Sequence, residues 1–227
     1  MPRRTLIVNA DDFGQSEAVN RGVIRAHESG IVTSASLMVR WPAASAAAGY
    51  ARAHRDLSLG VHLDLGEWTF EHGRWRALYR VAAEPEAEFR SQVERFRELV
   101  GCDPTHIDSH QHVHRDEPAR SAAVELARML GVPLRSFDSR VRYCGDFYGQ
   151  LGDGTPYPEG VTVERLLEIV RRLPPGITEL GCHPADEPVP SMYAHERVVE
   201  LEALCDPRVR ACIDAEAVEL RSYLTLE

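Results

Sequence analysis

Residues 5–14 read TLIVNADDFG, and this stretch decides the fold. A short apolar run, Thr5–Asn9, leads into two consecutive carboxylates, Asp11 and Asp12. The segment Ser16–Ser29 then places apolar residues at the three- and four-residue spacing that is typical of a helix. We therefore expect a buried strand with a polar end and then a helix, which is the repeating unit of parallel α/β folds.

The same alternation of strand and helix continues along the chain. Further strands are predicted at the apolar runs 31–39, 57–65, 105–110, 132–137 and 177–183, and further helices at 42–54, 84–100, 118–130, 162–173 and 193–205. The tail predicts a short helix after Pro207 and a strand near Val218–Leu224. Two segments rich in Gly, Pro and aromatic residues, Gly66–Glu84 and Tyr143–Gly160, are expected to be long loops over a site.

About seven such units predict a single domain spanning residues 1–227, folded as a distorted or incomplete (β/α) barrel that resembles a TIM barrel. A doubly wound open sheet is the alternative. In both folds the carboxyl ends of the parallel strands meet at one face, and the active site lies there. Polar residues at the strand ends are therefore expected to converge.

The composition of the chain excludes several classes of partner and chemistry. The chain has 26 basic and 35 acidic residues, and its net charge of −9 argues against a nucleic-acid partner. All the basic residues are Arg, so Schiff-base chemistry and a Walker A phosphate loop, which need Lys, are excluded. No apolar run approaches the ~20 residues of a membrane span. Five cysteines without a C-x-x-C pair fit a reducing compartment, so we expect a cytoplasmic protein.

Histidines mark the candidate site. Four of the ten histidines lie within nine residues, at positions 106, 110, 112 and 114. Because neutral imidazole is a common metal ligand, at least one is expected to bind a metal ion, although a histidine here could also hydrogen-bond within a loop. A single histidine in an apolar strand is more often a core residue than a ligand. His62 is such a residue, but its place near a strand end favours a role as a metal ligand. Two histidines with one carboxylate suit a hydrolytic metal centre.

Three other positions carry candidate chemistry. Asp11 and Asp12 could serve as turn or capping residues, but near a metal one could bind the ion while the other takes a proton from water. His183, which ends a later strand, is a candidate acid–base residue or a structural hydrogen-bonding group. Trp68 lies in a predicted loop, where it could stack on a sugar ring or belong to the core.

Five stretches occur together along nearly the whole chain: Leu6–Gly14, Gly30–Ser34, Gly60–His62, Thr105–His114 and Glu179–Ala185. In this order and spacing they resemble the YdjC-like (ChbG-type) carbohydrate deacetylases. The resemblance implies a distorted barrel related to the polysaccharide deacetylases and the removal of N-acetyl groups from small amino sugars with one divalent metal ion. Some relatives are linked to hopanoid synthesis, so the resemblance leaves the exact carbohydrate open.

The same resemblance assigns the site. It implies Asp12, His62 and His110 as metal ligands and Asp11 as general base. His183 matches a histidine near the site in that family, and we infer for it the role of general acid. His106, His112 and His114 would then lie around the ligands or face the substrate, and the candidate substrate contacts are His112, His114 and Trp68. Two imidazoles favour Zn²⁺, Ni²⁺ or Co²⁺, whereas the family is often described with Mg²⁺, so the choice between Zn²⁺ and Mg²⁺ stays open.

The predicted reaction is metal-assisted hydrolysis of an amide on a small carbohydrate. A phosphoesterase on a similar barrel is one alternative, and two metal ions per chain would favour it. A non-catalytic sugar- or metal-binding protein is another, and it would not need Asp11. A homodimer is expected only from the resemblance to the family, and no feature of the sequence itself indicates one.

Overall fold

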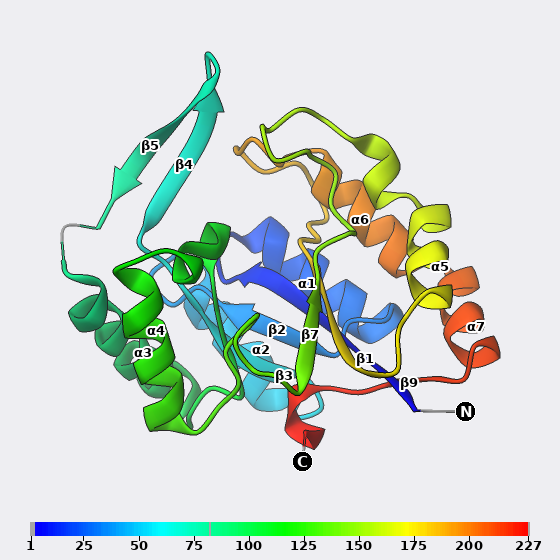
Figure 1. The fold of residues 1–227 in the computed structure, drawn as a ribbon, viewed down its shortest axis with the longest axis horizontal. Coiled ribbons are helices and arrows are strands. Elements are labelled where there is room, and N and C mark those ends of the chain that lie inside the picture. Colours follow the sequence, from blue (N-terminus) through cyan, green and yellow to red (C-terminus); the bar gives the residue numbers. More distant parts are fainter. Residues whose placement is uncertain (1–2, 82, 227) are drawn as a thin grey trace.

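A computed structural model describes residues 3–81 and 83–226 of the chain. Its main sheet contains β1 (Arg4–Phe13), β2 (Ser34–Leu37), β3 (Ser58–Leu63), β6 (Ile107–Ser109), β7 (Val141–Cys144), β8 (Gly176–Cys182) and β9 (Val218–Leu220). The helices are α1 (Glu17–Ser29), α2 (Ala44–Ala53), α3 (Pro85–Val100), α4 (Ala119–Leu130), α5 (Val163–Arg171), α6 (Glu196–Leu204) and α7 (Pro207–Ala215), arranged around the sheet (Figure 1). The predicted alternation of strand and helix is thus present.

The order of the strands shows that the sheet is an opened barrel. It runs β6-β3-β2-β1-β8-β7, with every pairing parallel, and β9 joins the beginning of β1. The first strand, β1, therefore lies between β2 and the late strand β8, as in a closed (β/α) barrel. A doubly wound sheet would instead change winding direction at a switch point. The prediction of a distorted or incomplete (β/α) barrel is confirmed, and the doubly wound alternative is wrong.

The barrel is incomplete beside β6. The predicted strand 132–137 is reduced to a single parallel bridge between Leu134 and Ile107. The Pro133 carbonyl accepts from the Ile107 backbone N–H. Because Pro133 has no N–H of its own to donate, a full ladder cannot form here. The short bridge still sets the position of Arg135, whose backbone N–H donates to the Ile107 carbonyl. In the described part of the chain, no ladder joins this segment to β7.

A hairpin replaces the first predicted loop. The segment Gly66–Glu84 contains two antiparallel strands, β4 (Gly66–Glu71) and β5 (Arg74–Arg80), which stand away from the barrel (Figure 1). The turn residues His72 and Gly73 have φ values of 52° and 77°, the left-handed pair that a tight hairpin turn requires. The second predicted loop, Tyr143–Gly160, includes the end of β7 but is otherwise irregular up to the short turn η2 (Pro158–Val161).

The core fills the space between the sheet and its helices. β1 contributes Leu6 and Val8, and α3 packs Phe89 and Phe96 into the same apolar cluster. No helix in the described ranges is long and apolar enough to cross a membrane.

Candidate active site

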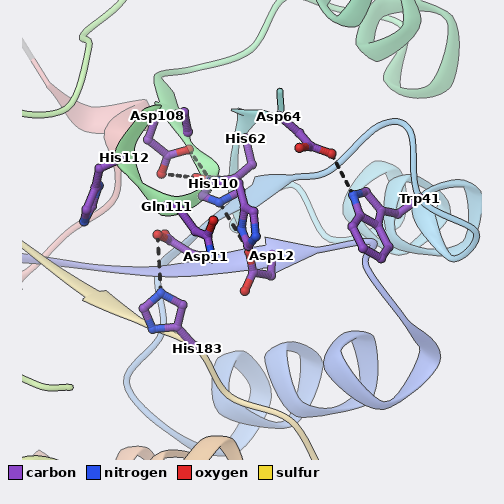
Figure 2. A network of polar contacts seen from close by, with 12 residues as sticks. Asp11, Asp12, Trp41, His62, Asp64, Asp108, His110, Gln111, His112 and His183 are labelled. Carbon is purple, nitrogen blue, oxygen red and sulfur yellow. Dashed lines mark hydrogen bonds and ion pairs between the residues drawn. The ribbon is translucent and has the colours of Figure 1, made fainter. Parts of the chain in front are cut away.

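The carboxyl ends of the strands bring the predicted residues together. Asp11 and Asp12 end β1, His62 lies in β3, and His110 begins the 3₁₀ turn η1 (His110–Arg115) that follows β6. His183 directly follows β8. Figure 2 shows their side chains gathered in one place, where they line a cavity of about 1010 Å³.

A distortion of β1 explains how two adjacent aspartates share one site. Successive side chains of a regular strand point to opposite faces. Here the register with β2 shifts between Ala10 and Phe13, and Asp12 adopts a left-handed φ of 63°. Bulges of this kind re-aim side chains next to active sites. As a result, both Asp11 and Asp12 line the cavity.

One group of buried donors fits a metal ion. Asp12 Oδ1 lies 3.0 Å from His110 Nδ1 and 3.3 Å from His62 Nε2. One donor atom from each residue falls within 4.8 Å of the others, and the three residues are at most 7% exposed. One carboxylate and two imidazoles, open to a cavity, form the donor set of a hydrolytic metal centre.

Two neighbours orient these donors. Asp108 Oδ1 lies 2.7 Å from His62 Nδ1, which leaves His62 Nε2 to face Asp12. Arg197 lies 2.6 Å from Asp12 Oδ2, so the other oxygen of Asp12 faces the histidines. Carboxylate partners of this kind fix the tautomer of a metal-binding histidine. The site is therefore held in shape by residues outside the donor set.

The electrostatics of the group favour a cation. Burial opposes the charged form of Asp12, but Arg197 and His110 outweigh it and hold the pKa of Asp12 well below its usual range. Burial likewise opposes a charged His110, yet Asp12 and Glu67 raise its pKa to about 9. Asp108 raises the pKa of His62 against the effect of burial. The carboxylates thus favour positive charge on the imidazoles, and a bound cation would supply that charge instead.

A buried arginine organises the other side of the site. Arg135 is 3% exposed and lies 2.6–2.7 Å from oxygens of three carboxylates, those of Asp11, Asp108 and Glu179. Burial raises the pKa of Asp11, but Arg135 outweighs it, so the net pKa of Asp11 is lowered. Asp11, His62 and Asp108 form the second group of potential metal donors in the described ranges. The guanidinium of Arg135 already supplies a cation to two of these three residues.

His183 faces Asp11 across the cavity. Its Nε2 lies 3.8 Å from Asp11 Oδ2, as the dashed line in Figure 2 marks. On the other side, Nδ1 lies 3.7 Å from Oε1 of Glu200, whose second oxygen accepts from the His183 backbone N–H at 2.5 Å. The rings of Tyr148 and Tyr193 contact the imidazole edge to face. His183 is therefore oriented toward the cavity between two carboxylates.

The remaining histidines of the cluster have different places. His112 lines the cavity beside Tyr143, with a left-handed φ of 54°. His114 is fully buried, lies outside the cavity lining and contacts Ser109 Oγ at 2.5 Å. The structure therefore places His114, one of the expected substrate contacts, beside the cavity lining and not in it. Trp68, from β4, does line the cavity.

His106 belongs to the interior of the barrel. Its ring stacks on Tyr223 at 3.9 Å, and Nε2 lies 2.9 Å from Asn9 Oδ1. Gly60 leaves room for the ring, because a Cβ there would come within 2.5 Å of His106 Nε2. Burial lowers the pKa of His106 to about 4. His106 therefore supports the sheet from within rather than facing the cavity.

As the pH falls from 7 to 5, the lowered pKa of His106 is expected to reduce the free energy of unfolding by about 2 kcal/mol. An unfolded histidine has a pKa of about 6.5, so between this value and about 4 the unfolded chain binds more protons. The stabilisation is present above pH 6.5 and is lost as the pH falls toward 4. The raised pKa of His110 acts in the opposite sense, so the comparison must isolate His106.

Urea unfolding of the wild type and of His106→Gln at pH 7, 6 and 5 makes this comparison. The variant is expected to show the shallower loss of stability with falling pH. Equal pH dependence in the two proteins would contradict the assignment.

The fold and the site together define the class: α/β half-barrel proteins that carry a carboxylate–histidine metal-binding cluster at the carboxyl ends of the strands. Within this class, the family model described as YdjC-like protein matches residues 5–215. The chain belongs to the YdjC-like family.

Named relatives span nearly the same length. A carbohydrate deacetylase from Geobacillus stearothermophilus is 36% identical, and the match covers 98% of both chains. A chitooligosaccharide deacetylase from Serratia marcescens is 30% identical over 98% of this chain and 99% of its own.

Solved structures share the fold. A protein from Enterococcus faecalis V583, provisionally described as a cellobiose-phosphate cleavage protein, superposes with a TM-score of 0.78 at 24% identity, covering 98% of both chains. A polysaccharide deacetylase from Bacillus cereus gives a TM-score of 0.55 at 13% identity, covering 97% of this chain and 92% of its own. The predicted structural relation to polysaccharide deacetylases is confirmed.

Proposed function

We propose that this chain is a metal-dependent hydrolase that removes N-acetyl groups from amino sugars, acting as a single domain of residues 1–227. The observation that carries the proposal is the convergence of a buried Asp–His–His donor set with Asp11 and His183 on one cavity. The relatives named carbohydrate and chitooligosaccharide deacetylase support the substrate class. Chitooligosaccharides, or a related glycan or glycolipid, are the substrates we propose.

Asp12, His62 and His110 would hold one divalent ion. Such an ion acts as a Lewis acid toward the acetyl carbonyl and increases the acidity of a water molecule. Two imidazole donors favour Zn²⁺ or a similar transition metal, whereas Mg²⁺ prefers oxygen ligands.

Asp11 is the proposed general base. Arg135 holds the carboxylate in its charged form, and Oδ2 of Asp11 faces the cavity on the side of His183. Each carboxylate oxygen has two lone pairs, so Oδ2 can accept from Arg135 and still take a proton from the attacking water. Asp11 therefore combines a fixed position with a free lone pair, as general-base catalysis requires.

His183 is the proposed general acid. An amine cannot leave as an anion, so the departing nitrogen must receive a proton. The carboxylates of Asp11 and Glu200 lie 3.8 Å and 3.7 Å from the two ring nitrogens of His183, so the imidazole is held between two acceptors beside the cavity.

The cavity wall suits a sugar. Trp68 from the hairpin and Tyr148 from the irregular segment after β7 both line it, together with His112. Aromatic faces pack against apolar sugar faces, while histidine and carboxylate groups can bind the hydroxyls. We propose Trp68 and His112 as substrate contacts.

The two alternatives make different demands on the same site. A two-metal phosphoesterase would need a second ion near Asp11 and Asp108, where Arg135 already provides the positive charge. A non-catalytic sugar-binding protein would not need a carboxylate fixed 3.8 Å from a cavity-facing imidazole. The geometry favours a hydrolase with one ion per chain.

The test is to supply the metal-loaded protein with N-acetylglucosamine dimers and trimers and, in parallel, with phosphomonoesters. We expect acetate and a free amine from the sugars, no phosphate, and one bound ion per chain. Phosphate release with two ions would establish the phosphoesterase, whereas sugar binding without any product would establish the non-catalytic alternative.

A further inference from the structure

The β4–β5 hairpin reaches the metal-binding cluster through one carboxylate. Glu67 Oε2 lies 2.8 Å from Nε2 of His110, and the Glu67 side chain is 19% exposed. Trp68, Trp75 and Arg80, on the same hairpin, line the cavity. The hairpin therefore contacts both the donor set and the space that a substrate would occupy.

A local irregularity aims Glu67 at the site. The pairing of β4 with β5 shifts register between Glu67 and Trp68, so these neighbours both line the cavity instead of pointing to opposite faces. Gly66 precedes them with a φ of 151°, and a Cβ at this position would lie 2.5 Å from the Tyr79 carbonyl oxygen. The base of the hairpin is thus shaped to turn Glu67 inward.

Gln111 fixes the hairpin to η1, next to His110. The backbone N–H of Trp68 donates to the Gln111 side-chain oxygen at 3.0 Å, and the Gln111 amide donates to the Trp68 carbonyl at 2.9 Å. Gln111 adopts a left-handed φ of 49°, a conformation that costs energy in a residue other than glycine. This strained residue holds the hairpin in register with His110.

The contact determines which nitrogen of His110 is free. A neutral imidazole carries a proton on one nitrogen and a lone pair on the other. Glu67 lies 2.8 Å from Nε2 and accepts its proton. When an ion replaces the other proton of the imidazole, the lone pair would therefore lie on Nδ1, the nitrogen on the side of Asp12 Oδ1 at 3.0 Å. Asp108 does the same for His62 with the two nitrogens exchanged.

We propose that Glu67 is a positioning residue that sets the tautomer of His110 and couples the hairpin wall of the cavity to the metal-binding cluster. This inference rests on the proposed metal-dependent function, with Asp12, His62 and His110 as ligands. Because coupling is reciprocal, metal binding should order the hairpin, and loss of the Glu67 contact should weaken metal binding.

The experiment compares Glu67→Ala, Glu67→Gln and, as a control on the same hairpin, the exposed Arg74→Ala. Affinity for Zn²⁺ and Co²⁺ is measured by competition with a chelator. Loss of a carboxylate behind a metal-binding histidine typically weakens binding by about 10–100-fold, and we expect this for Glu67→Ala. Glu67→Gln keeps an accepting oxygen and should fall between Ala and the wild type, while Arg74→Ala should match the wild type.

Hydrogen exchange gives a readout that does not depend on catalysis. In the wild type, added Zn²⁺ is expected to slow amide exchange across residues 66–80, and this protection should be reduced in Glu67→Ala. Thermal unfolding of the metal-free variants checks that all of them fold.

Wild-type metal affinity and wild-type protection in Glu67→Ala would overturn the proposal. A loss as large as that of His110→Ala, with a changed Co²⁺ absorption spectrum, would also overturn it, because Glu67 would then be a ligand. The proposed function fails separately: absence of acetate release with Glu67-dependent metal binding would remove the deacetylase assignment and leave the coupling intact.

Discussion

Asp11→Asn is expected to slow acetate release by about 10²–10⁴-fold while the protein still binds one metal ion. The amide has nearly the same shape as the carboxylate, but it cannot accept the proton of the attacking water. Asp11 lies outside the Asp12, His62 and His110 donor set, so its charge is not needed to hold the ion. The rate constant for acetate release and the metal content of the same sample measure both parts of the prediction.

The control is Asp103→Asn, which changes an exposed carboxylate paired with Arg97 and should leave both quantities unchanged. Loss of the metal ion in Asp11→Asn would place Asp11 among the ligands. Full activity in this variant would remove Asp11 from the mechanism.

Arg135→Met is expected to lower the free energy of unfolding by about 3–5 kcal/mol, the usual cost of removing one partner of a buried ion pair. Methionine fills part of the volume, but it leaves Asp11, Asp108 and Glu179 buried without their shared cation. Such carboxylates have raised pKa values and take up protons as the pH falls. The destabilisation should therefore be larger at pH 8 than at pH 5.

Urea unfolding at the two pH values measures this effect, with the surface variant Arg95→Met as the matched control. If Arg135→Met does not fold, Arg135→Lys keeps the charge without the forked geometry and should show a smaller loss of the same sign. A loss below about 1 kcal/mol for Arg135→Met would contradict the role of this network in stability.

The sequence predicts the barrel because each unit carries its own local signal. The apolar run of β1 and the helical spacing of α1 are legible in about 25 residues, and polar strand ends at Asp11 and His62 follow directly from the pattern. The convergence of these residues also follows, since parallel strands bring their carboxyl ends to one face. Their catalytic roles stay predictions.

The hairpin at residues 66–80 can be predicted from the sequence. Its aromatic and Gly content is typical of a loop, but Trp68, Thr69 and Phe70 are residues that favour strands, and His72-Gly73 is a two-residue turn after them. The contact of Glu67 with His110 depends on this hairpin, so it cannot be predicted from a loop.

The roles of Arg135 and Arg197 cannot be predicted from the sequence. They are two of 26 arginines, and nothing in their local sequence distinguishes them. Arg135 lies 124 positions from Asp11, and Arg197 lies 185 positions from Asp12. Only the bridge beside β6 and the packing of α6 bring these side chains to the carboxylates, so their roles depend on tertiary structure.

The most direct test of the account is acetate release from N-acetylglucosamine oligomers by the metal-free protein, with Zn²⁺, Mg²⁺, Co²⁺ or Ni²⁺ added back. We expect no acetate without metal, activity restored by a divalent ion that binds once per chain, and no restoration in His110→Ala. Acetate release that is equal with and without metal, or that survives in His110→Ala, would contradict it.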